Sequence, residues 1–175
     1  MNKHNFAILG PNKSLNLAVG ELLADDFGLR FVDSDALLEY EAGYNPGTGI
    51  QAMVQDYGKE YFYKKEAKHF RVQDTYEDSL FATSATTIMG EENCKKIAEY
   101  CLIILLFASK QVVIKRLMQD NSQHLKQDIL ALGGAYFENI ENNIKPLADI
   151  LVDTEGCSPT KIVEKIMQEM AQKFA

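Results

Sequence analysis

Residues 10–35 read GPNKSLNLAVGELLADDFGLRFVDSD, and this stretch decides the fold. It follows a short apolar run, Phe6–Leu9, that is typical of a buried strand. Apolar residues then recur at helical spacing over Leu15–Phe27, and a glycine directly after them predicts the end of the helix. A second strand is predicted over Leu29–Val32, with an aspartate immediately behind it. The order of strand, glycine, helix and strand is that of a phosphate-binding α/β unit.

The side chains that should contact phosphate are missing from this unit. A phosphate loop of the form G-x-x-x-x-G-K-[ST] needs glycines, a lysine and a hydroxyl. Gly10 is present, but the later motif positions hold Leu15, Asn16 and Leu17. Lys13 and Ser14 could supply a charge and a hydroxyl at the start of the helix, but only two residues separate Lys13 from Gly10. Two residues are too few to wrap a phosphate.

The bulk properties fit one globular domain over residues 1–175. A chain of 175 residues with 46% apolar residues can form a single sizeable core. The net charge of −7 argues against nucleic acid as a partner. The longest apolar run, Cys101–Ala108, is too short to span a membrane. Three cysteines without a C-x-x-C pair argue against a zinc site, and their odd number fits a cytoplasmic location.

Predicted strands and helices alternate along the rest of the chain. The further strands are Ser79–Thr83, Cys101–Phe107 and Ile150–Val152, and the further helices are Ala36–Ala42, Ile50–Tyr57, Lys59–Asp74, Glu91–Glu99, Lys110–Gln119, Ile129–Asn143 and Pro159–Phe174. This alternation predicts an α/β fold with a mostly parallel sheet covered on both faces. Ligands of such sheets bind beyond the carboxyl ends of the strands. Gly10, Asp33, Asp35 and Ser84 all follow strands, so we expect them to line one crevice.

At several separate points the chain resembles the shikimate kinase family, which are P-loop kinases of the nucleoside-monophosphate-kinase type. The family pattern G-x-x-G-x-G-K-S-T-x-G aligns without a gap with Gly10–Gly20, and F-x-D-x-D with Phe31–Asp35. Two weaker matches are Gly58–Glu66 for the pattern G-E-x-x-F-R-x-x-E and Ala82–Thr86 for A-T-G-G-G. Further weak matches are Leu22–Ala24 for a helix ending in L-A, Leu102–Phe107 with Arg116 and Leu117 for a strand and a helix with an R-L pair, and Pro146–Asp149 for the end of R-x-P-x-Y-x-x-x-A-D.

The resemblance implies a three-layer α/β/α fold of the P-loop kinase type with five parallel strands. It also implies Mg and ATP as cofactors, and phosphorylation of the 3-hydroxyl of shikimate. A lid is expected near 121–134 and a substrate-side region near 35–62. The implied catalytic residues are Asp33 and Asp35, of which Asp33 lies on the magnesium side. The implied ATP-site positions are Gly10, Lys13, Ser14, Asn16 and Arg116, and the substrate-site positions are Asp35, Tyr63, Ser84, Ala85, Thr86 and Ile140.

The family motifs are nevertheless degenerate at the phosphate loop, the substrate site and the lid, although Asp33, Asp35 and Arg116 are retained. Arginines of the family pattern are replaced by Tyr63, Ile140 and, in the lid, Gln123, and its A-T-G-G-G glycines by Ser84, Ala85 and Thr86. The main hypothesis is therefore a shikimate-kinase-like protein whose activity is lost or severely weakened. It would bind a small polyol or shikimate-like ligand, or regulate a protein partner or a homodimer. The alternative is an active ATP-dependent shikimate or polyol 3-phosphotransferase with a rearranged loop. A third possibility is a purely structural partner in an oligomer.

Non-catalytic roles remain open for several of these residues. Asp35 could cap the helix that follows it. Arg116 could form an ion pair on a helix surface. Leu15 and Leu17 could be core residues that fill an emptied phosphate cradle. We expect Glu66 on a solvated helix face, and His69 at the surface or an edge.

Overall fold

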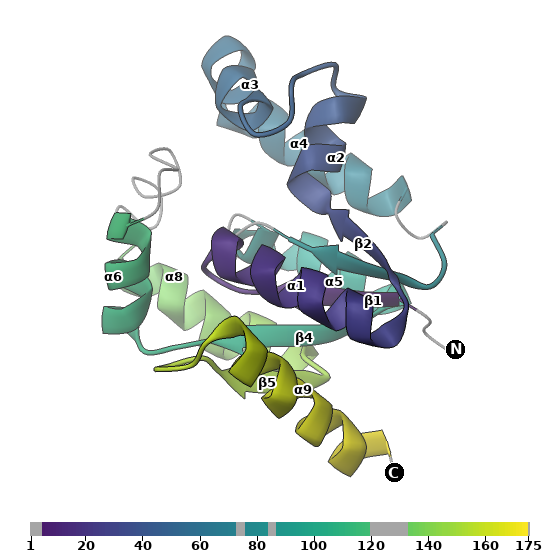
Figure 1. Ribbon diagram of the computed structural model, residues 1–175. Coiled ribbons are helices and arrows are strands. Elements are labelled where there is room, and N and C mark those ends of the chain that lie inside the picture. Colours follow the sequence, from purple (N-terminus) through teal and green to yellow (C-terminus); the bar gives the residue numbers. More distant parts are fainter. Residues whose placement is uncertain (1–4, 73–75, 84–86, 120–132, 175) are drawn as a thin grey trace.

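The computed structural model describes residues 5–72, 76–83, 87–119 and 133–174, and within them five parallel strands form one sheet (Figure 1). The strand order is β2-β3-β1-β4-β5. The bounds are β1 Asn5–Leu9, β2 Arg30–Asp33, β3 Ser79–Ala82, β4 Cys101–Phe107 and β5 Ile150–Asp153. β4 is apolar throughout because it is covered on both faces. The predicted α/β class and five-stranded parallel sheet are confirmed.

Helices lie on both faces of the sheet. Their bounds are α1 Lys13–Phe27, α2 Ser34–Glu41, α3 Gly49–Tyr57, α4 Lys59–Val72, α5 Glu91–Tyr100, α6 Lys110–Gln119, α8 Gly134–Asn139 and α9 Pro159–Phe174. α1 and α9 cover one face, and α5 and α8 lie behind the other (Figure 1). This is the three-layer α/β/α arrangement expected from the sequence. In the part of the chain that the structure describes, no helix is long and apolar enough to cross a membrane.

Each face of the sheet has its own apolar core. On the α1 and α9 side, Leu23 and Ile162 pack in one cluster with Ile104 of β4. On the other side, Ile97 and Leu105 belong to a second cluster. Successive side chains of each strand point to opposite faces of the sheet and so contribute to both cores. Polar residues are found at the ends of the strands.

A third, smaller cluster lies apart from the sheet, within the segment 35–62 for which the sequence predicts a substrate-side role. α2, α3 and α4 project beyond the end of β2 (Figure 1), and they enclose Leu38, Ile50, Met53 and Phe62. The buried carboxylate of Glu39 accepts hydrogen bonds from the backbone N–H groups of Gly47 and Ile50. This one side chain therefore fixes the turn between α2 and α3.

The segment before β5 departs from the expected helix Ile129–Asn143. Its described part consists of α8, a π-helical turn over Ile140–Ile144 and a 3-10 turn over Lys145–Leu147. Pro146 lacks a backbone N–H, so the regular helical pattern cannot run through it. The proposed lid over 121–134 lies outside the described residues except for Gly133 and Gly134.

Candidate functional site

The first turn of α1 stands where the aligned phosphate loop should be. Asn12 caps the helix, and its side-chain oxygen accepts a hydrogen bond from the backbone N–H of Leu15 at 2.8 Å. The backbone N–H of Asn16 donates to the carbonyl of Asn12 at 3.0 Å. The helix thus begins at Lys13 rather than Leu15 as predicted, because Asn12 supplies the N-cap. Backbone donors that a phosphate loop directs at its ligand are used here inside the helix.

Asn16 ties this turn to two strands. Its side chain is 1% exposed, and its Nδ2 donates to the carbonyl of Gly10 at 2.9 Å and to the carbonyl of Thr83 at 3.0 Å. Both amide hydrogens are therefore engaged, which leaves no donor for a phosphate oxygen. Asn16 takes the position of the motif lysine, so a neutral, internally bonded amide replaces a cation.

Gly10 is required by Asn16 rather than by phosphate. A Cβ on Gly10 would lie 2.4 Å from Oδ1 of Asn16, which is far inside van der Waals contact. The hypothesis that Leu15 and Leu17 fill the cradle is wrong, because both leucines are only half-buried and Asn16 occupies the space against Gly10. Among the described residues, Oδ1 of Asn16 has no hydrogen-bond donor, a cost of ~1–3 kcal/mol.

Lys13 reaches across to the two aspartates after β2. Its Nζ lies 2.8 Å from Oδ2 of Asp35 and 3.7 Å from Oδ1 of Asp33. The side chain of Asp35 is 7% exposed and that of Lys13 is 27% exposed. Burial alone would lower the pKa of Lys13, but attraction by Asp35, Asp33 and Glu39 outweighs burial and raises it. Burial raises the pKa of Asp35, and Lys13 opposes that shift.

Asp33 has a second task at the start of α2. Its Oδ1 accepts hydrogen bonds from the backbone N–H groups of Asp35 at 3.0 Å and Ala36 at 3.2 Å. The capping residue is therefore Asp33, and the interpretation of Asp35 as the cap is wrong. Asp35 instead points its carboxylate at Lys13. The crevice predicted from Gly10, Asp33, Asp35 and Ser84 stays a prediction, since Ser84 lies outside the described residues. The two carboxylates expected to line it are paired with Lys13.

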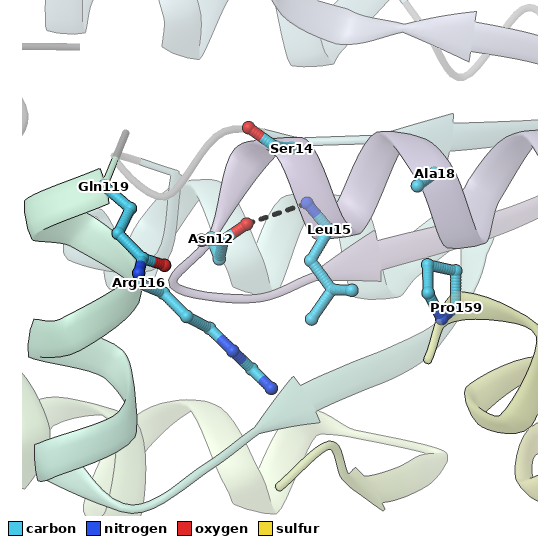
Figure 2. A pocket seen from close by; sticks show the side chains of 7 residues that line it. All are labelled: Asn12, Ser14, Leu15, Ala18, Arg116, Gln119 and Pro159. Atoms are coloured by element: carbon cyan, nitrogen blue, oxygen red, sulfur yellow. Dashed lines mark hydrogen bonds between the residues drawn. The ribbon is translucent and has the colours of Figure 1, made fainter. Parts of the chain in front are cut away.

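A separate pocket of about 330 Å³ lies between α1, α6 and the start of α9 (Figure 2). It is lined by Asn12, Ser14, Leu15, Ala18, Arg116, Gln119 and Pro159. The guanidinium of Arg116 donates to the hydroxyl and to the carbonyl of Thr154, both at 2.8 Å. Thr154 in turn donates to the carbonyl of Phe107 at 2.9 Å, so Arg116 is fixed against the end of β4. The structure brings Ser14 and Arg116 to one pocket, away from the Lys13 ion pair.

Of the remaining predicted substrate residues, the two that the structure describes belong to different apolar clusters. Tyr63 is partly buried against the cluster of α2, α3 and α4. Ile140 is buried in the sheet core beside Tyr136 and Ile144, so its side chain lines no crevice. Ser84, Ala85 and Thr86 lie outside the described residues, as does Gln123.

Three buried polar residues of this region were not recognised from the sequence. Glu66 is buried, and its carboxylate accepts hydrogen bonds from the Thr87 hydroxyl at 3.0 Å and the Asn93 amide at 3.1 Å. His69 is also buried, with Nδ1 2.8 Å from a carboxylate oxygen of Glu41. The expectations of a solvated Glu66 and a surface His69 are wrong. Phe62, Glu66 and His69 recur at helical spacing, which is the signal that would have placed them on one inner face. Glu39, the third, gave no such signal.

A family model for shikimate kinase matches residues 17–171. The chain belongs to the shikimate kinase family. The match begins directly after the residues that form the first turn of α1, so the most altered part of the phosphate loop lies outside it. The predicted family resemblance is confirmed.

Curated relatives in the shikimate kinase family match almost end to end. A protein named shikimate kinase from Thermodesulfovibrio yellowstonii is 28% identical, over 94% of this chain and 94% of the relative. Another of the same name, from Geobacter sulfurreducens, is 30% identical, over 93% of this chain and 84% of the relative. Among solved structures, shikimate kinase from Aquifex aeolicus superposes with a TM-score of 0.81 at 20% identity, covering 97% of this chain and 98% of that one. The shikimate complex from Acinetobacter baumannii gives 0.80 at 18% identity, with 98% and 94% covered.

Membership of the shikimate kinase family implies use of ATP and Mg, and the residues at the expected positions do not fit these groups. The cradle for phosphates holds the Asn16 amide, and the motif hydroxyl is Leu17. The carboxylates of Asp33 and Asp35 already contact the Lys13 ammonium. Within the described ranges, no three His, Cys, Asp or Glu side chains come together as a metal site.

Proposed function

We propose that this member of the shikimate kinase family has lost, or has severely weakened, phosphoryl transfer from ATP. Its remaining role is to bind a small polyol or shikimate-like ligand, or to regulate a protein partner, which includes a second copy of this chain. The observation that carries the proposal is the position of Asn16. Its amide is bonded to Gly10 and Thr83 in the space of a phosphate loop, while α1 begins only three residues after Gly10.

The energetics of phosphoryl transfer support this proposal. Catalysis of this reaction is mostly positioning and stabilisation of spread negative charge. Removal of a single preorganised stabilising group costs about 3–4 kcal/mol, or a rate factor of ~10²–10³. Here the lysine position holds Asn16 and the hydroxyl position holds Leu17. The two losses fall on one loop, so their effects are not additive, but either one is large.

An assay of product formation tests the proposal directly. The protein is incubated with ATP, Mg²⁺ and shikimate, and phosphorylated shikimate is measured by mass spectrometry beside the Geobacter sulfurreducens relative. We expect a rate at least ~10³-fold below that of the relative. A rate within tenfold of the relative, abolished by Asp35→Ala, would overturn the proposal.

A second candidate is an active ATP-dependent phosphotransferase, acting on shikimate or a related polyol through a rearranged loop. The names of the relatives favour it, and so does one piece of geometry. Lys13 places a cation at the start of α1, within 2.8 Å of Asp35, and the pocket beside Arg116 is open. In this candidate Lys13 replaces the motif lysine, so Lys13→Met must abolish turnover as completely as Asp35→Ala.

A further inference from the structure

Lys13 occupies a position that has no side chain in the family pattern. The aligned G-x-x-G-x-G-K-S motif places a glycine there, and this chain places a four-carbon amine. The first turn of α1 directs that amine away from the pocket beside Arg116, and Lys13 is not among the residues that line it. The amine instead reaches two carboxylates that belong to a different strand end.

The ammonium meets the requirements of a bound cation. Its Nζ contacts Asp35 at 2.8 Å and Asp33 at 3.7 Å, so a single charge bridges both carboxylates. Asp35 is buried and Asp33 is also engaged in capping α2, so both oxygens are held in place before any ligand arrives. A lysine at the N-terminus of a helix is unfavourable for the helix dipole, so the ion pair is the interaction that stabilises it there.

We infer that Lys13 is a built-in cation for Asp33 and Asp35: its ammonium takes the position beside the two carboxylates that a divalent cation would otherwise occupy. A divalent cation prefers one or two carboxylates with water completing its shell. Beside a fixed ammonium, it would meet repulsion and would find both carboxylates already paired. The wild-type protein therefore holds no divalent cation at these residues, and removal of the amine creates a site. This inference rests on the Lys13 geometry and not on the proposed loss of activity.

Binding of Mn²⁺, followed by the loss of its free electron paramagnetic resonance signal, tests the inference. We expect no saturable binding by the wild-type protein that depends on Asp33 and Asp35. The nearly isosteric Lys13→Met variant should gain saturable Mn²⁺ binding, with a Kd at least tenfold below that of any Mn²⁺ binding by the wild-type protein. Mg²⁺ should compete with Mn²⁺ for this gained site. The triple variant Lys13→Met, Asp33→Asn, Asp35→Asn should lose the gained binding.

Each other outcome overturns the inference. Wild-type Mn²⁺ binding that disappears in the double variant Asp33→Asn, Asp35→Asn would show that Lys13 does not exclude the metal. A folded Lys13→Met variant without gained binding would show that the amine does not stand in for a cation. If Lys13→Met fails to fold by circular dichroism, Lys13→Gln takes its place with the same expectations. Because these readouts need no turnover, they are independent of the product assay.

Discussion

Two neighbouring regions at the carboxyl end of the sheet differ in how much space the side chains of the protein leave open. In the region of Gly10, Asn16 and Asp35, side chains of the protein itself occupy the space and pair the charges. In the pocket beside Arg116, about 330 Å³ remain open, and the guanidinium is held by neutral oxygens of Thr154. The difference is the one that the proposed function requires, with side chains of the protein filling one region while the neighbouring pocket stays accessible.

We call the region of Gly10, Asn16 and Asp35 the closed region, because its polar side chains contact other parts of the chain and so stabilise the fold. The Asn16 amide and the Asp35 carboxylate are buried, and the loss of a partner from a buried polar group is costly. Substitutions there should therefore reduce stability more than substitutions beside the open pocket. The predictions below test this contrast, from the largest expected effect to the smallest.

Asn16→Ala should have the largest effect. It removes the donors for the carbonyls of Gly10 and Thr83, which are both buried, and leaves a cavity. We expect a loss of about 2–4 kcal/mol in the free energy of unfolding, measured by urea denaturation. The matched control is Asn143→Ala, since the Asn143 amide donates to the side chain of Asn139 in a partly buried position. If Asn16→Ala lowers the free energy of unfolding no more than Asn143→Ala does, the claim that the Asn16 hydrogen bonds stabilise this region is wrong.

Lys13→Met should lower the free energy of unfolding by about 2 kcal/mol. This is below the ~3–5 kcal/mol for breaking a fully buried ion pair, because Lys13 is partly exposed. The surface control Lys161→Met, which breaks the exposed pair with Glu164, should change stability little. The double variant Lys13→Met, Asp35→Asn should recover part of the loss. Equal effects of Lys13→Met and Lys161→Met would contradict the account.

The cost of Lys13→Met should also depend on pH. Burial raises the pKa of Asp35 above its unfolded value, so the folded state binds more protons and stability falls as pH rises through that window. Lys13 limits this shift, whereas the nearby charges of Asp33 and Glu39 add to it, so removal of the Lys13 ammonium raises the pKa of Asp35 further. The stability gap between wild type and Lys13→Met should therefore widen from about pH 4 to pH 7. A gap that is constant or narrows over this range would contradict the assigned pair.

Glu39→Gln should have an intermediate effect. The carboxylate accepts from the backbone of Gly47 and Ile50, and the amide retains one acceptor oxygen for them. We expect a loss of about 1–2 kcal/mol, with faster hydrogen exchange at the two N–H groups. Unchanged exchange at these amides would show that the turn between α2 and α3 is held by other contacts.

Arg116→Lys should have the smallest effect on stability, about 1 kcal/mol or less, because one ammonium cannot reproduce both bonds to Thr154. Urea denaturation measures this loss. An effect as large as that of Asn16→Ala would erase the contrast between the closed and the open region.

The sequence predicted the fold well because fold depends on repeated local patterns. The apolar run Cys101–Phe107 predicts a strand, and the glycine after Phe27 predicts the end of a helix. Neither prediction requires knowing which residues pack against these segments. The site was less predictable, since Asn16 bonds to Thr83, 67 residues away, and such a partner is set only by tertiary packing. Loss of the motif lysine was visible in the sequence, but its replacement by an internally bonded amide was not. The same holds for Glu66, whose partner Thr87 lies 21 residues further along the chain.

Thermal unfolding of the wild-type protein with and without Mg-ATP tests the central claim, that the phosphate end is closed by the chain itself. A ligand at 100 times its Kd adds ~2.7 kcal/mol of stability. For a domain of this size, that corresponds to a rise in Tm of about 5–10 °C. The account predicts no saturable rise at millimolar Mg-ATP, with a clear rise for the Geobacter sulfurreducens relative in the same experiment. A saturable rise of several degrees in this protein would contradict it.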